Sequence, residues 1–102
     1  MKRNEGKHTS ESQVIKNIVA AMEKYGCYGW GKTTTKSAIG YAAYPDYSFR
    51  WPQGAAFSVA KIVRKLEKAG VIGFGFDPRG YYLKTNYKKS LDKMNPNQLL
   101  TT

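Results

Sequence analysis

One short stretch of this chain carries residues whose types and spacing are typical of phosphate chemistry. GCYGWGKT, at residues 26–33, has two glycines followed by Lys32 and Thr33 at the spacing of a phosphate-binding P-loop. Such a loop holds phosphate when a buried strand delivers it to the N-terminus of a helix, because backbone N–H groups and the helix dipole then face the anion. The flanking elements therefore decide whether this stretch binds a nucleotide.

The residues before this stretch predict a helix rather than a strand. Apolar residues recur at the spacing of an amphipathic helix that begins at Ser10 or Ser12, and Gly26 stands where a left-handed residue would end it. The residues of this apolar stripe are Val14, Ile15, Ile18, Val19, Met22 and Tyr25. Nucleotide binding at 26–33 is therefore a remote alternative, and we expect Lys32→Ala to remove no nucleotide affinity, since none should exist.

The chain has too few cysteine and histidine residues for the chemistry that these residues usually support together. Cys27 is the only cysteine and His8 the only histidine, so neither a disulfide nor a Cys/His metal site can form within one chain. His8 lies in a polar leader, residues 1–9, which lacks apolar anchors and is expected to be flexible. Because no nucleophile stands beside a positioned base, we predict no catalytic residue, no metal and no cofactor, and a protein that is not an enzyme.

The charge balance indicates a polyanionic partner. Lys and Arg number 17 against 7 acidic residues, which gives a net charge of +10 over 102 residues and a field that attracts nucleic acid. Hydrophobic residues make up 41% of the chain, which is enough for one folded domain. With no apolar run long enough to span a membrane and no signal peptide, we expect a cytoplasmic protein without a membrane partner, associated with the nucleoid if it is bacterial.

A second helix and an aromatic loop are expected after the glycine-rich stretch. Three consecutive threonines offer hydroxyl caps for a short helix that continues through Ala43. The loop at residues 43–54 contains two prolines and four aromatic residues at irregular spacing. We expect these aromatic side chains to pack in the core, because stacking on bases would instead imply a single-stranded or RNA ligand.

The clearest helix is predicted at 55–69, and a β-hairpin is predicted after it. Gly70 can end the helix, and two strand-like runs at 71–76 and 81–85 flank residues 77–80, whose Asp, Pro and Gly fit a type I turn. The apolar face of the helix consists of Val59, Ile62, Val63 and Leu66. The polar face carries several lysines and therefore remains free to meet a partner.

This order of elements resembles the winged helix-turn-helix family of small bacterial, plasmid and viral transcription regulators. SVAKIVRKLEKAGVI, at residues 58–72, resembles the recognition helix and the strand after it, and VIGFGFDPRGYYLKT, at residues 71–85, resembles the wing. The resemblance implies an α+β fold at residues 10–86, with three helices, a C-terminal β-hairpin wing and room for a short third strand. The tail, 87–102, is expected to be a short helix or disordered. The aromatic loop is longer than the corresponding connection in the family.

The resemblance implies non-enzymatic, sequence-specific binding of double-stranded DNA, by a transcriptional regulator or a phage- or plasmid-type accessory factor. The helix at 55–69 would enter the major groove, while the wing at 71–85 would brace on the backbone or the minor groove. The candidate groove-facing residues are Gln53, Ser58, Lys61 and Lys65, with Arg64 beside them. The candidate contacts to the DNA backbone are Thr35, Lys36, Arg50 and Lys84, and Arg79 serves the wing.

The same positive charge fits a second kind of partner. A winged helix can instead dock an acidic protein, as a small viral inhibitor of a host protein would. A homodimer is a further expectation; it would use either the first helix or the apolar residues of the tail, and its DNA site would be approximately palindromic. Those tail residues are Leu91, Met94, Leu99 and Leu100.

Overall fold

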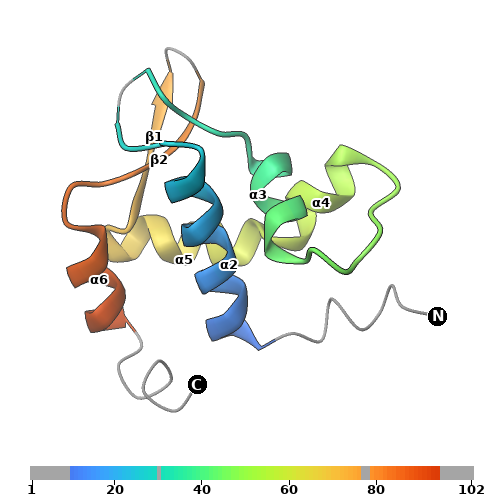
Figure 1. The fold of residues 1–102 in the computed structure, drawn as a ribbon, viewed down its shortest axis with the longest axis horizontal. Coiled ribbons are helices and arrows are strands. Elements are labelled where there is room, and N and C mark those ends of the chain that lie inside the picture. Colours follow the sequence, from blue (N-terminus) through green and yellow to red (C-terminus); the bar gives the residue numbers. More distant parts are fainter. Residues whose placement is uncertain (1–9, 30, 77–78, 95–102) are drawn as a thin grey trace.

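The computed structural model describes residues 10–29, 31–76 and 79–94, and this part of the chain is α+β, as predicted (Figure 1). It contains five helices and one two-stranded antiparallel sheet, whereas three helices were expected. The predicted flexible leader lies outside the described residues. In chain order the elements are α2 (Glu11–Lys24), α3 (Lys36–Ala43), α4 (Pro52–Ser58), α5 (Ala60–Ala69), β1 (Ile72–Phe76), β2 (Arg79–Leu83) and α6 (Tyr87–Met94).

Both ends of α2 are formed by the residues that the sequence predicted. The Ser10 hydroxyl accepts a hydrogen bond from the Gln13 amide at 3.3 Å and so caps the N-terminus. At the other end Gly26 adopts a φ of 71°, and the Cys27 amide donates to the Met22 carbonyl at 2.9 Å. Tyr25 was predicted to lie on the apolar stripe, but it is 64% exposed because the helix has already ended at Lys24.

Helices α3 and α4 cross at a glycine. The prediction of a threonine-capped helix through Ala43 is confirmed, with the Thr35 hydroxyl accepting from the Ala38 amide at 3.1 Å. A Cβ atom on Gly40 would lie 2.1 Å from the carbonyl oxygen of Ala55, which is far inside van der Waals contact. Gly40 is therefore required for the close approach of the two helices, although it weakens α3 intrinsically.

The single helix predicted at 55–69 is wrong, because the chain forms two helices that meet at Val59. The Ser58 hydroxyl donates to the Ala55 carbonyl at 2.7 Å, which is the carbonyl that the Val59 amide would use in a continuous helix. The Val59 amide instead donates to Ala56 at 3.3 Å. A side-chain hydrogen bond thus occupies the carbonyl that a continuous helix would use, which a pattern of apolar residues does not reveal.

The hairpin has a shorter turn than predicted. Phe76 pairs with Arg79, so Arg79 and Gly80 belong to β2, and the two residues between the strands lie outside the described residues. A Cβ atom on Gly80 would lie 2.7 Å from the Thr34 carbonyl oxygen. Gly80 is therefore needed for close contact with another segment of the chain. The sequence had indicated that Gly80 closes the turn, and that prediction is wrong.

The short third strand that the sequence allowed is reduced to a single bridge. Thr34 and Tyr81 exchange both backbone hydrogen bonds, at 2.9 and 2.7 Å. The Leu83 amide, farther along β2, donates to the Cys27 carbonyl at 2.7 Å. The connection between α2 and α3 is therefore attached to the outer edge of β2.

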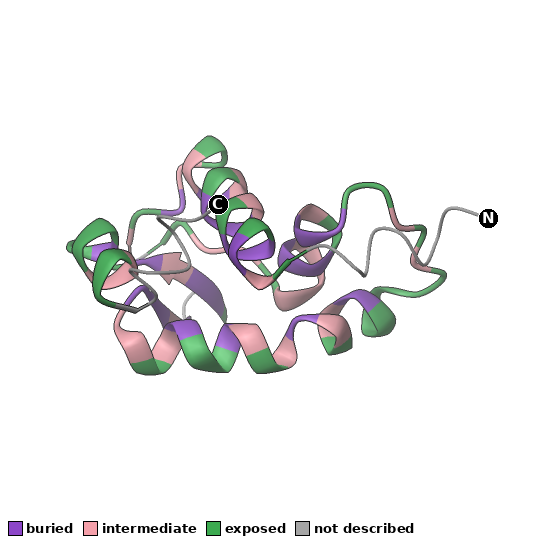
Figure 2. Cartoon of the chain, turned by 90° about the horizontal axis from the view of Figure 1, so that it is seen from below, coloured by how far each residue is buried: buried purple, intermediate pink, exposed green. Residues whose placement is uncertain are grey.

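One core holds the elements together, and α5 forms one side of it. Val63 and Leu66 of α5 are buried together with Ile18 and Met22 of α2 and Leu83 of β2. Figure 2 shows α4 and α5 following one another along one edge of the molecule, with α2, α3 and α6 on the other side of the core. The outer side of the α4–α5 edge is consequently exposed.

Candidate nucleic-acid interface

The charged side of α5 is presented to solvent because the opposite side is fixed in the core. Leu66 is completely buried and Val63 nearly so, and residues on the other side of an amphipathic helix must then face outward. Lys61, Arg64 and Lys68 recur at a spacing of three and four residues and are exposed. These three residues are called the α5 cations below.

The α5 cations lie in a part of the chain that is poor in compensating acidic residues. Between Asp46 and Glu67 the sequence contains no acidic residue at all. Within the described residues, neither Lys61 nor Arg64 forms an ion pair. Their charges therefore project a positive field from this edge of the molecule, which favours contact with a polyanion.

Lys65 differs from the α5 cations, although the sequence predicted it to face the groove with Lys61. Its ammonium group lies 2.9 Å from a carboxylate oxygen of Glu11 in the first turn of α2. Both side chains are partly exposed, so the pair stabilises the fold by at most about 1 kcal/mol. The structure thus directs Lys65 toward α2 and away from the outward group.

The outer surface of α4 offers polar and apolar groups but no charge. Gln53 and Gly54 are exposed, as the prediction for Gln53 requires. The Ser58 hydroxyl donates its proton to the Ala55 carbonyl, so its lone pairs remain as acceptors, and its role in the groove stays a prediction. Phe57 is 86% exposed, more than any other large hydrophobic residue described.

Sequence reasoning missed Phe57 and misjudged Trp51. Of the aromatic residues in the loop, Tyr44 is buried and Tyr47 packs on Phe49 with ring centroids 4.6 Å apart, as expected. Trp51 was expected to fill the core but is 64% exposed. The position of Phe57 could have predicted its exposure. It precedes the buried Val59 by two residues, and residues two apart in a helix do not share a face.

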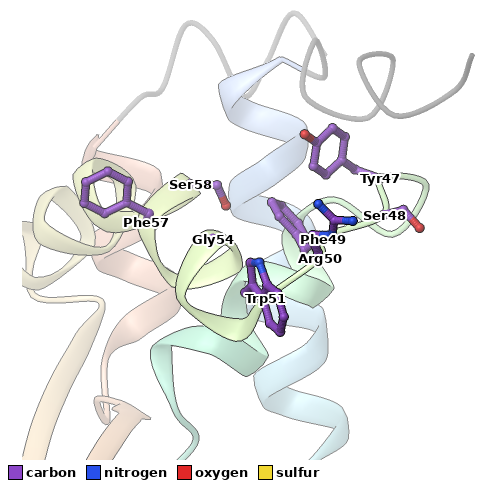
Figure 3. Close-up of a pocket in the computed structure, with 8 residues that line it drawn as sticks. All are labelled: Tyr47, Ser48, Phe49, Arg50, Trp51, Gly54, Phe57 and Ser58. Atoms are coloured by element: carbon purple, nitrogen blue, oxygen red, sulfur yellow. The ribbon is translucent and has the colours of Figure 1, made fainter.

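A hollow of about 620 Å³ borders α4 and the aromatic loop (Figure 3). Arg50, predicted as a phosphate contact, lies at this hollow and is exposed. The rings of Trp51 and Phe57 point to different sides of α4 in Figure 3. The residues that line the hollow are Tyr47, Ser48, Phe49, Arg50, Trp51, Gly54, Phe57 and Ser58.

A second group of predicted residues gathers where α3 begins beside the hairpin. Thr35, Lys36 and Arg79 line one hollow, although they are separated by more than 40 residues of sequence. The guanidinium carbon of Arg79 lies 6.0 Å from the centre of the Phe74 ring, at the outer limit of a cation–π contact. The Thr35 hydroxyl accepts the capping hydrogen bond of α3 and keeps its own proton, so Thr35, Lys36 and Arg79 can all donate to an anion here.

Lys84 lies at the far end of α5 from α4. Its amide donates to the Val71 carbonyl at 3.0 Å, and it borders the same hollow as Gly70, the residue that ends α5. The ten predicted residues are therefore not one cluster. Six belong to the α4–α5 edge and the adjoining Arg50, three, Thr35, Lys36 and Arg79, gather beside the hairpin, and Lys84 lies at the end of α5.

The glycine-rich stretch at 26–33 does not have the geometry of a phosphate loop. It follows a helix, α2, and it contains a tight turn in which the Lys32 amide donates to the Gly29 carbonyl at 3.1 Å. Three residues separate Lys32 from the first residue of α3, so Lys32 is not in the first turn of a helix. The stretch joins α2 to the edge of β2.

The described residues contain neither a group of three acidic, cysteine or histidine side chains that could hold a metal ion, nor a helix long and apolar enough to span a membrane. Burial raises the pKa of the Cys27 thiol, which keeps it in its unreactive protonated form. Comparison with family models, curated proteins and solved structures found no match to this chain. The functional interpretation therefore depends on the arrangement of its own residues.

Proposed function

We propose that this chain is a non-enzymatic, winged-helix protein that binds double-stranded DNA in a sequence-specific manner. The order of elements supports the proposal: α2, the Thr34–Tyr81 bridge, α3, the α4–α5 pair and then a hairpin follow the order of the family that the sequence resembles. The pair α4–α5 takes the place of one recognition helix. A role in transcriptional regulation, or as a phage- or plasmid-type accessory factor, follows from that family.

The observation that carries the proposal is the exposed line of α5 cations, on an edge whose single acidic residue, Glu67, lies near its end. In the proposed complex α4 and α5 lie in the major groove, which is wide enough to admit a helix. Lys36 and Lys84 contact the backbone, while Arg79 at the hairpin contacts the backbone or the minor groove. Repression or recruitment then results from occupancy of the site.

Salt dependence of duplex binding tests this proposal. We expect the affinity for a random DNA duplex to fall steeply between roughly 50 and 200 mM salt, because each phosphate contact releases counterions. Lys61→Ala and Arg64→Ala should each weaken binding and lower the slope of log affinity against log salt by about one. Lys93→Ala is the matched control, since Lys93 is exposed on α6 and is not part of the α4–α5 edge. Equal effects of the three variants would contradict the proposed surface.

The second candidate function is docking to an acidic protein, and the exposed ring of Trp51 favours it. Tryptophan and arginine dominate binding energy at protein interfaces, and Trp51 stands beside Arg50 at the hollow. If no duplex binds at low salt while an acidic protein binds and Trp51→Ala abolishes that binding, this candidate replaces DNA binding.

The expected homodimer stays a prediction, but the structure limits how it can form. Ile15 and Val19 of α2 are already buried in the monomer, so the apolar stripe of the first helix cannot serve as an interface. Leu91 of α6 is partly exposed and borders a hollow between α2 and α6. Leu99 and Leu100 lie outside the described residues.

A further inference from the structure

Phe57 occupies an unusual position for an aromatic side chain. It is 86% exposed, and it makes no ring contact with another aromatic residue of the described part of the chain. Large apolar groups are normally buried, and a fully exposed phenylalanine contributes nothing to the core. Its exposure on the outer side of the α4–α5 edge leaves the ring free to contact an apolar group of a partner.

The neighbours of Phe57 restrict what that partner can be. Gln53 precedes it by four residues within α4, so both side chains belong on the same side of that helix, and Lys61 follows in the first turn of α5. Gly54, between Gln53 and Phe57, is exposed and carries no side chain, and the nearest atom to a Cβ at this position would be a ring carbon of Phe49 at 3.9 Å, an ordinary van der Waals distance. A flat, polyanionic surface can thus approach the backbone of α4 closely.

The major groove of DNA carries one apolar group that fits this arrangement. Thymine presents its 5-methyl group there, and phenylalanine is one of the side chains that contact it, whereas Gln can form two hydrogen bonds with the adenine edge. The usual reader of guanine is Arg or Lys, and α4 contains neither. The outer side of α4 therefore matches A·T pairs better than G·C pairs.

We infer that Phe57 contacts thymine methyl groups in the major groove and, with Gln53, gives this protein a preference for A·T pairs. This inference rests on the proposed function and specifies its target. The α5 cations then supply phosphate contacts without sequence information, while α4 reads the bases. In helix-turn-helix proteins the N-terminal part of the recognition helix likewise contacts base edges, and α4 is the N-terminal part of the α4–α5 edge.

Removal of the methyl group alone tests the inference. A short duplex of alternating A and T is compared with the same duplex in which every thymine is replaced by uracil. We expect the wild-type protein to bind the uracil duplex more weakly, by about fourfold for each methyl group that Phe57 contacts. Phe57→Ala should bind the thymine duplex at least about tenfold more weakly than the wild type and should bind both duplexes equally.

Two controls keep the result specific to Phe57. Trp51→Ala removes an exposed ring on another side of α4 and should retain the difference between thymine and uracil. In a duplex of alternating G and C, replacing cytosine by 5-methylcytosine restores a methyl group in the groove. That replacement should strengthen wild-type binding but leave Phe57→Ala unchanged.

The outcomes separate this inference from the proposed function. If the wild-type protein binds no duplex at low salt, the proposed function fails. If it binds both duplexes equally, or if Phe57→Ala keeps the difference, only the inference is overturned. A preference for single-stranded oligothymidine that disappears in Phe57→Ala would also overturn it, because the ring would then stack on an unpaired base.

Discussion

Helices α4 and α5 are consecutive in the chain and lie along the same edge, yet they differ in almost every property that matters for binding. α5 buries Val63 and Leu66 and exposes the α5 cations. α4 has no charged residue, touches the core through Ala55 and exposes Phe57. If the chain binds DNA as proposed, electrostatic attraction and base recognition belong to separate short helices.

The break at Val59 separates the two helices. The hydrogen bond from Ser58 to Ala55 interrupts the ladder, and the Val59 side chain remains fully buried beneath the interruption. α4 is therefore positioned by its contact with α3 as well as by α5. Stability variants can show whether the two helices depend on different parts of the core.

The largest effect is expected where α5 meets the core. Leu66→Ala should lower the free energy of unfolding by about 2–5 kcal/mol, because it removes a completely buried side chain and leaves a cavity. Phe57→Ala on α4 is the matched comparison and should change it by less than about 0.5 kcal/mol, since Phe57 contributes little to the core. Urea denaturation of both variants measures the difference; a large loss in Phe57→Ala would show that α4 is packed differently.

The next effect concerns the crossing that holds α4. Gly40→Ala should lower the free energy of unfolding by about 3 kcal/mol, because the new methyl group would overlap the Ala55 carbonyl. Gly54→Ala, on the exposed side of α4, should instead raise it by about 0.5–1 kcal/mol, since alanine has the higher helix propensity and meets no close atom. Thermal unfolding measures the change in stability for each variant, and equal destabilisation by the two would contradict the close approach of α3 and α4.

A smaller effect is expected on the other side of the core, where α6 is attached. The Tyr87 hydroxyl donates to the Glu23 carboxylate of α2; this hydrogen bond raises the pKa of Tyr87, and burial raises it further. Tyr87→Phe should lower the free energy of unfolding by about 1.5 kcal/mol. Urea denaturation at neutral pH measures this loss.

The raised pKa of Tyr87 also has a consequence at alkaline pH. Above about pH 10 the unfolded chain releases the tyrosine proton while the folded chain retains it, so this contribution to stability is present below that pH and falls as pH rises. The stability difference between wild type and Tyr87→Phe should therefore shrink as the pH is raised above 10. A difference that stays constant would show that the hydrogen bond does not form.

The smallest effect distinguishes Lys65 from the α5 cations. Lys65→Ala should cost at most about 1 kcal/mol of stability, because the ion pair with Glu11 is partly exposed and screened by salt. It should weaken DNA binding less than Lys61→Ala does at the same salt concentration. If Lys65→Ala weakens binding as much as Lys61→Ala, Lys65 leaves Glu11 and binds a phosphate in the complex. The distinction between Lys65 and the α5 cations would then be wrong.

Elements governed by local sequence were predictable, whereas features that depend on distant contacts were not. The caps of α2 and α3, and Gly26 and Gly70 as helix ends, follow from residue type and position alone. The Lys65–Glu11 pair joins residues 54 positions apart, and Gly80 is required by Thr34. The spacing of apolar and polar residues along the chain does not reveal either of these distant contacts.

The candidate site was predictable only in part for the same reason. The exposure of Lys61 and Arg64 follows from the helical pattern that buries Val63 and Leu66. The break at Val59 coincides with a hydrogen bond from the Ser58 side chain, and Trp51 is exposed although Phe49 and Tyr47 of the same loop pack together. Phe57 was overlooked because its type suggested the core, although its position in the helix did not.

The most direct test of the central claim is to map the DNA-binding surface by NMR. A random duplex is titrated into isotope-labelled protein, and the shifts of backbone amide resonances are followed at low salt. We predict the largest changes in α4 and α5, with smaller changes at Lys36, Arg79 and Lys84. Changes centred on the opposite side of the core, along α2 and α6, would contradict the claim that the α4–α5 edge binds duplex DNA.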